Sequence, residues 1–365
     1  MDRRAFLRNS LIGLAMGSCS PANSLRPISE AEDQTREPLS NKPRILVISD
    51  IRVGKGDPDD RQSMAHLMMY ANEVDILGIW PDSLDSGLEG TQMVLDRYEQ
   101  DYNTPDYKFP DLNYPPPSHL RSKLLTSHDQ AIAAVKAEAS VNDPRPLYML
   151  VWGGTHRVTQ SLEKLTPIEQ SKIRLISIGT YLRDNALADG DGQKYNWNAW
   201  GEARMDIWNR FPDLWWLEMD WSWNGMVFNQ DLKIADETKV LNDFLAQKAG
   251  ALGAHITEVF PKYFRALDTN SLLYLLDSSN DVDDPTRGSW AGRYYSPFSE
   301  RPNYYTGIDG GHEWDYANPA RTWQNARDVF TARINTCISQ RNVWHQAFMQ
   351  KVLELYGQEP NASNT

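Results

Sequence analysis

The sequence predicts an α/β fold, a doubly wound and mostly parallel β-sheet with helices on both faces. Short, continuous apolar runs recur along the chain, and such runs are typical of strands that are buried on both sides. Helical patterns separate successive runs, which indicates crossover connections between parallel strands. The chain has 365 residues and a hydrophobic content of 41%, so it can bury a large core.

Five strands are expected, each ending at a turn or loop. In chain order they cover residues 45–48, 74–80, 147–152, 173–178 and 214–218. Helices are expected between them and near the end of the chain, at residues 64–70, 88–98, 127–139, from the glycine turn at 153–154 to residue 165, and at 344–356. The segment 101–118 is rich in proline and tyrosine and is expected to be a surface loop.

The beginning of the chain is typical of an export signal. Arg3 and Arg4 resemble the twin-arginine motif, and the apolar stretch after them is too short to span a bilayer. The sequence that ends at Cys19 resembles a lipobox, with Cys19 as the lipidated residue. We therefore expect an exported protein of the periplasm or cell envelope, whose contact with the membrane is a lipid anchor on Cys19. The expected organisation is a signal peptide at 1–19, a flexible tether at 20–42, one domain at 43–345, and a helix end and tail at 346–365.

Charge and composition narrow the class of partner. The formal net charge is −12, which argues against nucleic acid because phosphate binding needs a basic surface. The 13 tryptophans and 16 tyrosines suit stacking on a sugar or a base, and they are also ordinary core residues. A small-molecule nucleoside or carbohydrate is the expected ligand.

Acidic residues gather where the first predicted strand ends. Asp50 follows that strand, and Asp57, Asp59 and Asp60 follow within a short loop before the next helix. Ligands of open α/β sheets bind outside the carboxyl ends of strands, so the loop lies where a site is expected. Carboxylates that converge there repel one another unless a cation or protons compensate, and calcium prefers oxygen ligands. The alternative is that Asp59 and Asp60 cap a helix and complement its dipole.

Two further segments carry candidate site residues. Trp221, Trp223 and Asn224 suit a sugar platform, although packing in the core is the commoner reason for tryptophans in such a region. Asp268 precedes an apolar run and would, taken alone, be interpreted as a helix N-cap. The acidic loops at 189–191 and 281–284 are interpreted as solvated surface, because neither has the pattern of an EF-hand.

In this order along the chain, Asp50, the loop 56–63, the turn 151–154 and the pair Asp268-Thr269 resemble the nucleoside-hydrolase-like superfamily. The similarity is greatest to an exported branch of unknown function that is often labelled cellulose-binding, and it covers residues 43–340. Members of the superfamily hold calcium at the bottom of the pocket, where it contacts ribose hydroxyls and the attacking water. The resemblance therefore implies a calcium-dependent hydrolase of N-glycosyl or related bonds. Relatives are often oligomeric, so the resemblance also makes a homo-oligomer an expectation for this chain.

The resemblance also implies individual roles. Asp50 would be a calcium ligand and the general base, and Asp59 would bind a sugar hydroxyl. Asp60, Asp268 and the backbone carbonyl of Thr155 would complete the calcium ligands from the protein. Anionic groups beside the sugar and an activated water both favour cleavage through an oxocarbenium-like transition state.

Three departures from the family pattern favour a second hypothesis. Asp59 follows Asp50 by nine positions, so the loop is longer than in nucleoside hydrolases. Leu267 and Ala249 stand where relatives have histidine. The alternative to a hydrolase is therefore a non-catalytic carbohydrate-binding lipoprotein that uses the same pocket.

Overall fold

The computed structural model describes residues 41–54, 58–180, 203–277, 279–316 and 325–358. Residues 42–365 form one compact unit. At its centre is a seven-stranded sheet in the order β2-β1-β3-β4-β5-β7-β6. The strands are β1 Arg44–Ser49, β2 Asp75–Pro81, β3 Leu147–Val151, β4 Ile173–Ile178, β5 Trp215–Met219, β6 Tyr294–Tyr295 and β7 Tyr304–Gly307.

The sheet is parallel from β2 to β7, and only the short edge strand β6 runs antiparallel. The chain adds β2 on one side of β1 and then β3, β4 and β5 on the other side. Strand order therefore reverses between β1 and β3, and open α/β sheets bind ligands at such a switch point. The predicted doubly wound, mostly parallel sheet is confirmed.

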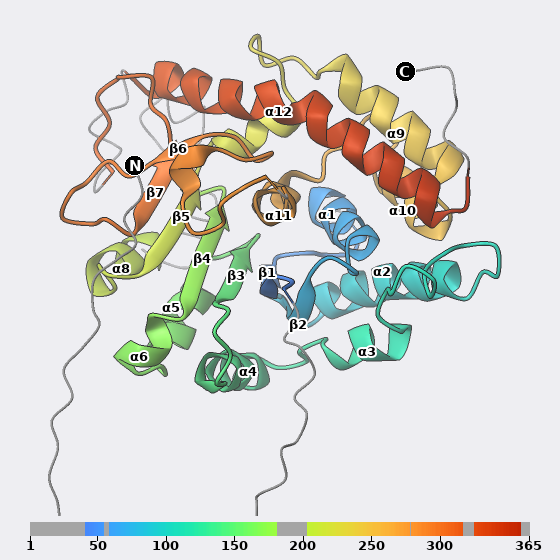
Figure 1. Cartoon of the computed structure of the whole chain (residues 1–365), viewed down its shortest axis with the longest axis horizontal. Coiled ribbons are helices and arrows are strands. Elements are labelled where there is room, and N and C mark those ends of the chain that lie inside the picture. The colour runs from blue at the N-terminus through green and yellow to red at the C-terminus, as the bar shows by residue number, and fades with distance from the viewer. Residues whose placement is uncertain (1–40, 55–57, 181–202, 278, 317–324, 359–365) are drawn as a thin grey trace, which may run out of the picture. The chain divides into compact units, whose positions relative to one another are not determined.

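Helices cover both faces of the sheet (Figure 1). Alternate residues of β1 enter two different cores, with Ile45 and Val47 packed on one face and Leu46 and Ile48 on the other. This alternation explains why the strand is a continuous apolar run. The helices are α1 Pro58–Met69, α2 Ser86–Tyr102, α3 Pro117–Ser122, α4 His128–Ser140, α5 His156–Leu162, α6 Pro167–Gln170, α8 Ala203–Arg210, α9 Asp236–Lys248, α10 Ala251–Val259, α11 Asn270–Leu276 and α12 Ala326–Leu355, with short 3₁₀ turns at η1 Ser222–Met226, η2 Leu267–Thr269 and η3 Pro285–Arg287.

Helix α12 is much longer than the predicted helix at 344–356, since it begins at Ala326 and has 30 residues. Its buried face includes Arg333 and Arg341, which are 0% and 3% exposed. Charged residues at buried positions interrupt the apolar periodicity, and this is why the pattern shows only the second half of the helix. Among the residues that the structure describes, no helix is both long and apolar enough to cross a membrane.

Candidate functional site

The carboxyl ends of the parallel strands meet at one edge of the sheet, and the candidate residues lie there. Asp50 follows β1 and is half-buried, and Thr155 follows the turn after β3 and is fully buried. Gly153 allows the two segments to approach closely, because a Cβ at this position would lie 2.9 Å from the backbone nitrogen of Asp50. The turn therefore needs glycine for the close approach of the chain to Asp50.

Helix α1 brings Asp59 and Asp60 to the same edge, in its first turn. Both are buried, with 7% and 3% of their surface exposed. The Ser49 hydroxyl donates a 2.7 Å hydrogen bond to Asp60 Oδ1 and accepts a 3.1 Å bond from the backbone N–H of Ile51. The last residue of β1 thus fixes the carboxylate of Asp60 against the strand that carries Asp50.

Asp268 reaches this place through contacts between η2 and α1. Its backbone N–H donates to the Ser63 hydroxyl at 3.3 Å. One residue further, the Thr269 hydroxyl donates to a backbone carbonyl and lies 2.8 Å from Nδ1 of His66. Because the threonine proton is already used, the geometry assigns the proton of this contact to Nδ1 of the histidine. Two consecutive turns of α1 therefore position Asp268.

The four acids lie close enough to affect one another electrostatically. The pKa of Asp60 is raised well above its usual value, first by burial and then by the charges of Asp50, Asp268 and Asp59. The hydrogen bond from Ser49 opposes this rise without cancelling it. The effect of each neighbour on Asp60 means that four carboxylates, from three separate parts of the sequence, share one local field.

Asp59 lies beside a cationic side chain. The Arg265 guanidinium lies 3.7 Å from Asp59 Oδ1, and the Arg265 backbone N–H donates to Gln62 Oε1 at 2.7 Å. Gln62 is itself a buried residue of α1, so the arginine is fixed beside the first turn of that helix. A carboxylate oxygen in this position can accept a hydrogen bond from a sugar hydroxyl.

The candidate ligands suit calcium chemically, because all of them are oxygens and the hydrogen bond from Ser49 only partly compensates the buried charge of Asp60. In the described part of the chain, however, no three histidine, cysteine, aspartate or glutamate side chains are arranged so that they could hold a metal ion as they stand. The loop between Asp50 and Asp59 includes residues 55–57, and Asp57 therefore lies outside the described residues, as do Asp189 and Asp191.

The predicted sugar platform lies on η1, which packs against η2. The ring of Trp221 is 0% exposed and contacts Phe330 and Trp314 at centroid distances of 5.6 Å and 5.1 Å, as a core residue would. Trp223 is partly exposed, and its indole N–H donates to a backbone carbonyl at 2.8 Å. Asn224 is 7% exposed and donates to the carbonyl of Trp221. Of the three, Trp223 presents the most surface to a ligand.

A polar cluster at the end of β2 was not anticipated. Asp82 accepts a 2.8 Å hydrogen bond from Arg157 and lies 3.5 Å from Nε2 of His156. Arg157 also lies 2.8 Å from His128, to which Trp80 donates at 3.1 Å. Burial lowers the pKa of His156 to about 4, so this imidazole is neutral near neutral pH. The sequence signal was an acid directly after a predicted strand, the same signal that selected Asp50.

A second unanticipated network lies at the end of β5. Glu218 accepts two hydrogen bonds from Arg204, at 2.9 Å and 2.6 Å, and all of these groups are buried. Asp220 pairs with Arg333 of α12, and burial raises the pKa of this carboxyl to about 6. These pairs attach α8 and α12 to the strand that leads into η1.

Two positions where relatives carry histidine have structural explanations here. Leu267 is 4% exposed and lies in the hydrophobic core beside Asp268. Ala249 precedes α10, whose first two N–H groups, those of Ala251 and Leu252, donate to the Asp101 carboxylate at 2.6 Å and 2.9 Å. The segment around Ala249 is thus the beginning of a capped helix.

Comparison with known proteins gives one family and several similar folds. Residues 44–294 match the family described as "Cellulose-binding Sde182, nucleoside hydrolase-like domain". The structure of a nucleoside hydrolase-related hypothetical protein from Saccharophagus degradans, associated with carbohydrate metabolism, matches with a TM-score of 0.56 and 20% identity, over 88% of this chain and 73% of that chain. No curated protein sequence matches significantly.

More distant similarity extends to two other solved structures. The inosine-uridine preferring nucleoside hydrolase from Bacillus anthracis has a TM-score of 0.44 and 13% identity, over 79% of this chain and 100% of that chain. The type III effector protein XopQ, solved with adenosine diphosphate ribose, has a TM-score of 0.41 and 14% identity, over 82% and 95%.

Proposed function

Because this chain belongs to the family of cellulose-binding, nucleoside hydrolase-like domains, we propose that it is a calcium-dependent hydrolase of N-glycosyl or related glycosidic bonds. The observation that carries the proposal is the buried carboxylate of Asp60, whose pKa is raised by burial and by three acidic neighbours. A divalent cation compensates such a group of charges, and oxygen donors select a hard cation.

Asp50, Asp60, Asp268 and the carbonyl of Thr155 would hold the ion. A bound calcium would supply positive charge and Lewis acidity beside the sugar. In the proposed reaction Asp50 takes a proton from the attacking water, and Asp59 accepts a hydrogen bond from a sugar hydroxyl. The carboxylates also favour the positive charge that develops on the sugar ring in the transition state.

The partner is accordingly a small nucleoside or carbohydrate. Trp223 offers partly exposed aromatic surface beside the segment that carries Asp268, and aromatic rings stack on sugars and bases. The sequence before residue 43 supports export by a twin-arginine signal and a lipid anchor on Cys19, which would place the substrate in the periplasm or cell envelope.

Isothermal titration of the calcium-free protein with calcium tests the proposed metal site. We expect saturable binding, at least about tenfold weaker binding in Asp268→Asn because one anionic ligand is lost, and unchanged binding in the control Asp283→Asn. Asp283 is an exposed acid of a surface loop. Equal binding by Asp268→Asn and the wild type, or no binding by either, would refute the calcium site.

A second candidate function is non-catalytic carbohydrate binding at the same pocket. The observation that favours it is Leu267, a buried aliphatic side chain with no proton to give to a leaving group. Product release from a panel of nucleosides and cello-oligosaccharides separates the two functions. Saturable sugar binding without release of product would establish the second function and overturn the first.

A further inference from the structure

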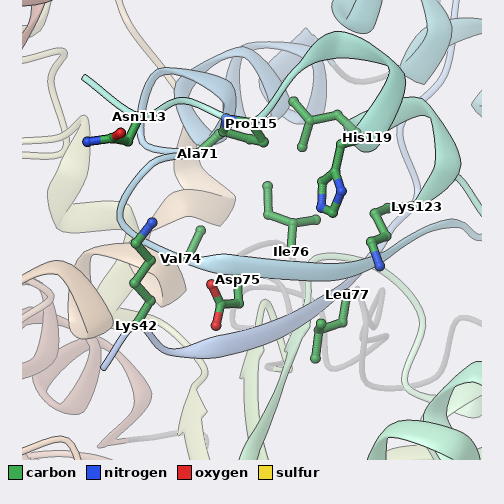
Figure 2. Close-up of a pocket in the computed structure, with 11 residues that line it drawn as sticks. Lys42, Ala71, Val74, Asp75, Ile76, Leu77, Asn113, Pro115, His119 and Lys123 are labelled. Carbon is green, nitrogen blue, oxygen red and sulfur yellow. The ribbon is translucent and has the colours of Figure 1, made fainter. Parts of the chain in front are cut away.

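We propose that a cavity at the outer edge of β2 binds a small organic carboxylate with an apolar body. The cavity has a volume of about 240 Å³ and lies along the first residues of β2, the edge strand of the sheet (Figure 2). Its size suits a single small molecule rather than a macromolecule.

The floor of the cavity is apolar. Val74 and Ile76 line it from the strand side, and Leu120 lines it from α3. These side chains are almost completely buried, with 3%, 4% and 0% of their surface exposed. A bare inorganic ion would lose hydration against such a floor without compensation, so the occupant should have an apolar part.

The rim of the cavity is cationic. Figure 2 shows Lys42 and Lys123 on different sides of the cavity, with His119 above the strand. Asp75, the acid that lines the cavity, is paired with Arg145 at 2.5 Å. The chain has a net charge of −12, so two lysines at one pocket reverse the sign of the charge locally. Such a reversal raises the local concentration of anions.

The geometry of the edge excludes an added peptide strand. The N–H of Ile79 donates to the carbonyl of Lys123 at 2.8 Å, and the N–H of Leu125 donates to the carbonyl of Ile79 at 2.9 Å. The outer edge of β2 is therefore already paired at Ile79, and only the residues before it border the cavity. A typical strand of about five residues would not fit beside so short an open edge.

This inference is independent of the proposed hydrolase. The cavity lies at the amino end of β2, whereas Asp50 lies beyond the carboxyl end of the neighbouring β1. A strand of seven residues separates the two ends by roughly 20 Å. The calcium site and the carboxylate site can therefore be tested and refuted independently.

The test is a ligand-observed NMR titration of the calcium-free full chain with benzoate and with its neutral analogue benzamide. We expect saturable benzoate binding, and affinity for benzamide lower by about tenfold, since a charge-assisted hydrogen bond is lost. Lys123→Met keeps the aliphatic stem and should weaken benzoate binding by about tenfold, whereas Lys123→Arg should keep it within about threefold. The control Lys136→Met, at an exposed position on α4, should bind like the wild type.

Three results would overturn the proposal. They are equal affinity for benzoate and benzamide, unchanged benzoate binding in Lys123→Met, and absence of saturable binding in the wild type. A pentaglutamate peptide that binds while benzoate does not would also overturn it, in favour of a peptide partner. Filling the cavity by Ile76→Phe provides a second variant, which should abolish benzoate binding even if Lys123→Met does not fold.

Discussion

Replacing Asp60 with asparagine should stabilise the calcium-free protein and abolish its calcium binding. The carboxylate is 3% exposed and lies in the field of Asp50, Asp59 and Asp268. Asparagine has nearly the same shape, and its side-chain oxygen can still accept the hydrogen bond from Ser49. The substitution therefore removes the charge while it keeps the packing.

The sign follows from proton linkage. The pKa of Asp60 is higher in the folded protein than in the unfolded chain, so the folded state holds this proton more tightly. Its contribution to stability is complete below the unfolded pKa and is lost as the pH rises through the folded pKa. At pH 7 this buried carboxyl group therefore lowers the stability of the calcium-free protein, and Asp60→Asn should raise the free energy of unfolding by about 1–3 kcal/mol.

Urea unfolding in the presence of a chelator measures this difference, and a calcium titration measures the loss of binding. A contrasting variant is Glu218→Gln, because the pairing of this buried carboxylate with Arg204 outweighs burial and lowers its pKa. Its loss should destabilise the protein by about 3–5 kcal/mol, as for other broken buried ion pairs. If Asp60→Asn lowers the stability of the calcium-free protein, or binds calcium like the wild type, the electrostatic reasoning is wrong.

Three further predictions concern stability. Burial lowers the pKa of five histidines, to about 3 for His66 and His345, to about 4 for His156 and His255, and in the same direction for His128. Unfolding lets these histidines bind protons, so stability should fall from pH 6.5 towards pH 4 by up to about 1.4 kcal/mol per pH unit for each group. The buried acids with raised pKa values, Asp60, Asp101 and Asp220, act in the opposite direction and are fewer, so a urea midpoint that does not fall would contradict the assignment. Gly153→Ala places a Cβ 2.9 Å from the Asp50 backbone and should cost about 1–3 kcal/mol and weaken calcium binding. In the control Gly90→Ala in α2, the nearest atom to the new Cβ is a side-chain carbon of Ile51 at 3.2 Å and the nearest backbone atom is at 3.4 Å, so this variant should be nearly neutral in the same assays. Arg333→Met leaves the buried Asp220 carboxylate unpaired and should cost about 3–5 kcal/mol; adding Asp220→Asn should recover part of this loss in a double-mutant cycle, and strict additivity would show that the pair does not interact.

Much of the fold can be predicted from local sequence patterns. The strand predicted at residues 173–178 is the observed β4, and the other four predicted strands differ from the structure by no more than two residues at either end. Strands buried on both faces are continuous apolar runs, and the turns after them are marked by glycine, proline or acids. By contrast, β6 and β7 are short and rich in tyrosine, and they lack such runs.

The first half of α12 was missed for a different reason. Arg333 is fully buried there and pairs with Asp220 from the end of β5. A charged residue at a buried position looks like a surface position in sequence, because its partner lies more than one hundred residues away. Only the folded chain shows that the charge is compensated.

The sequence by itself determined the class of the sheet and the loop that carries Asp50, Asp59 and Asp60, because a strand end and a helix beginning are local features. Tertiary structure decided which distant residues join that loop. Asp268 arrives through the contacts of η2 with Ser63 and His66, while Trp221 turns into the core. The close approach of η2 to α1 depends on long-range packing, which no sequence period records, and it is this packing that places the charge of Asp268 within reach of Asp60.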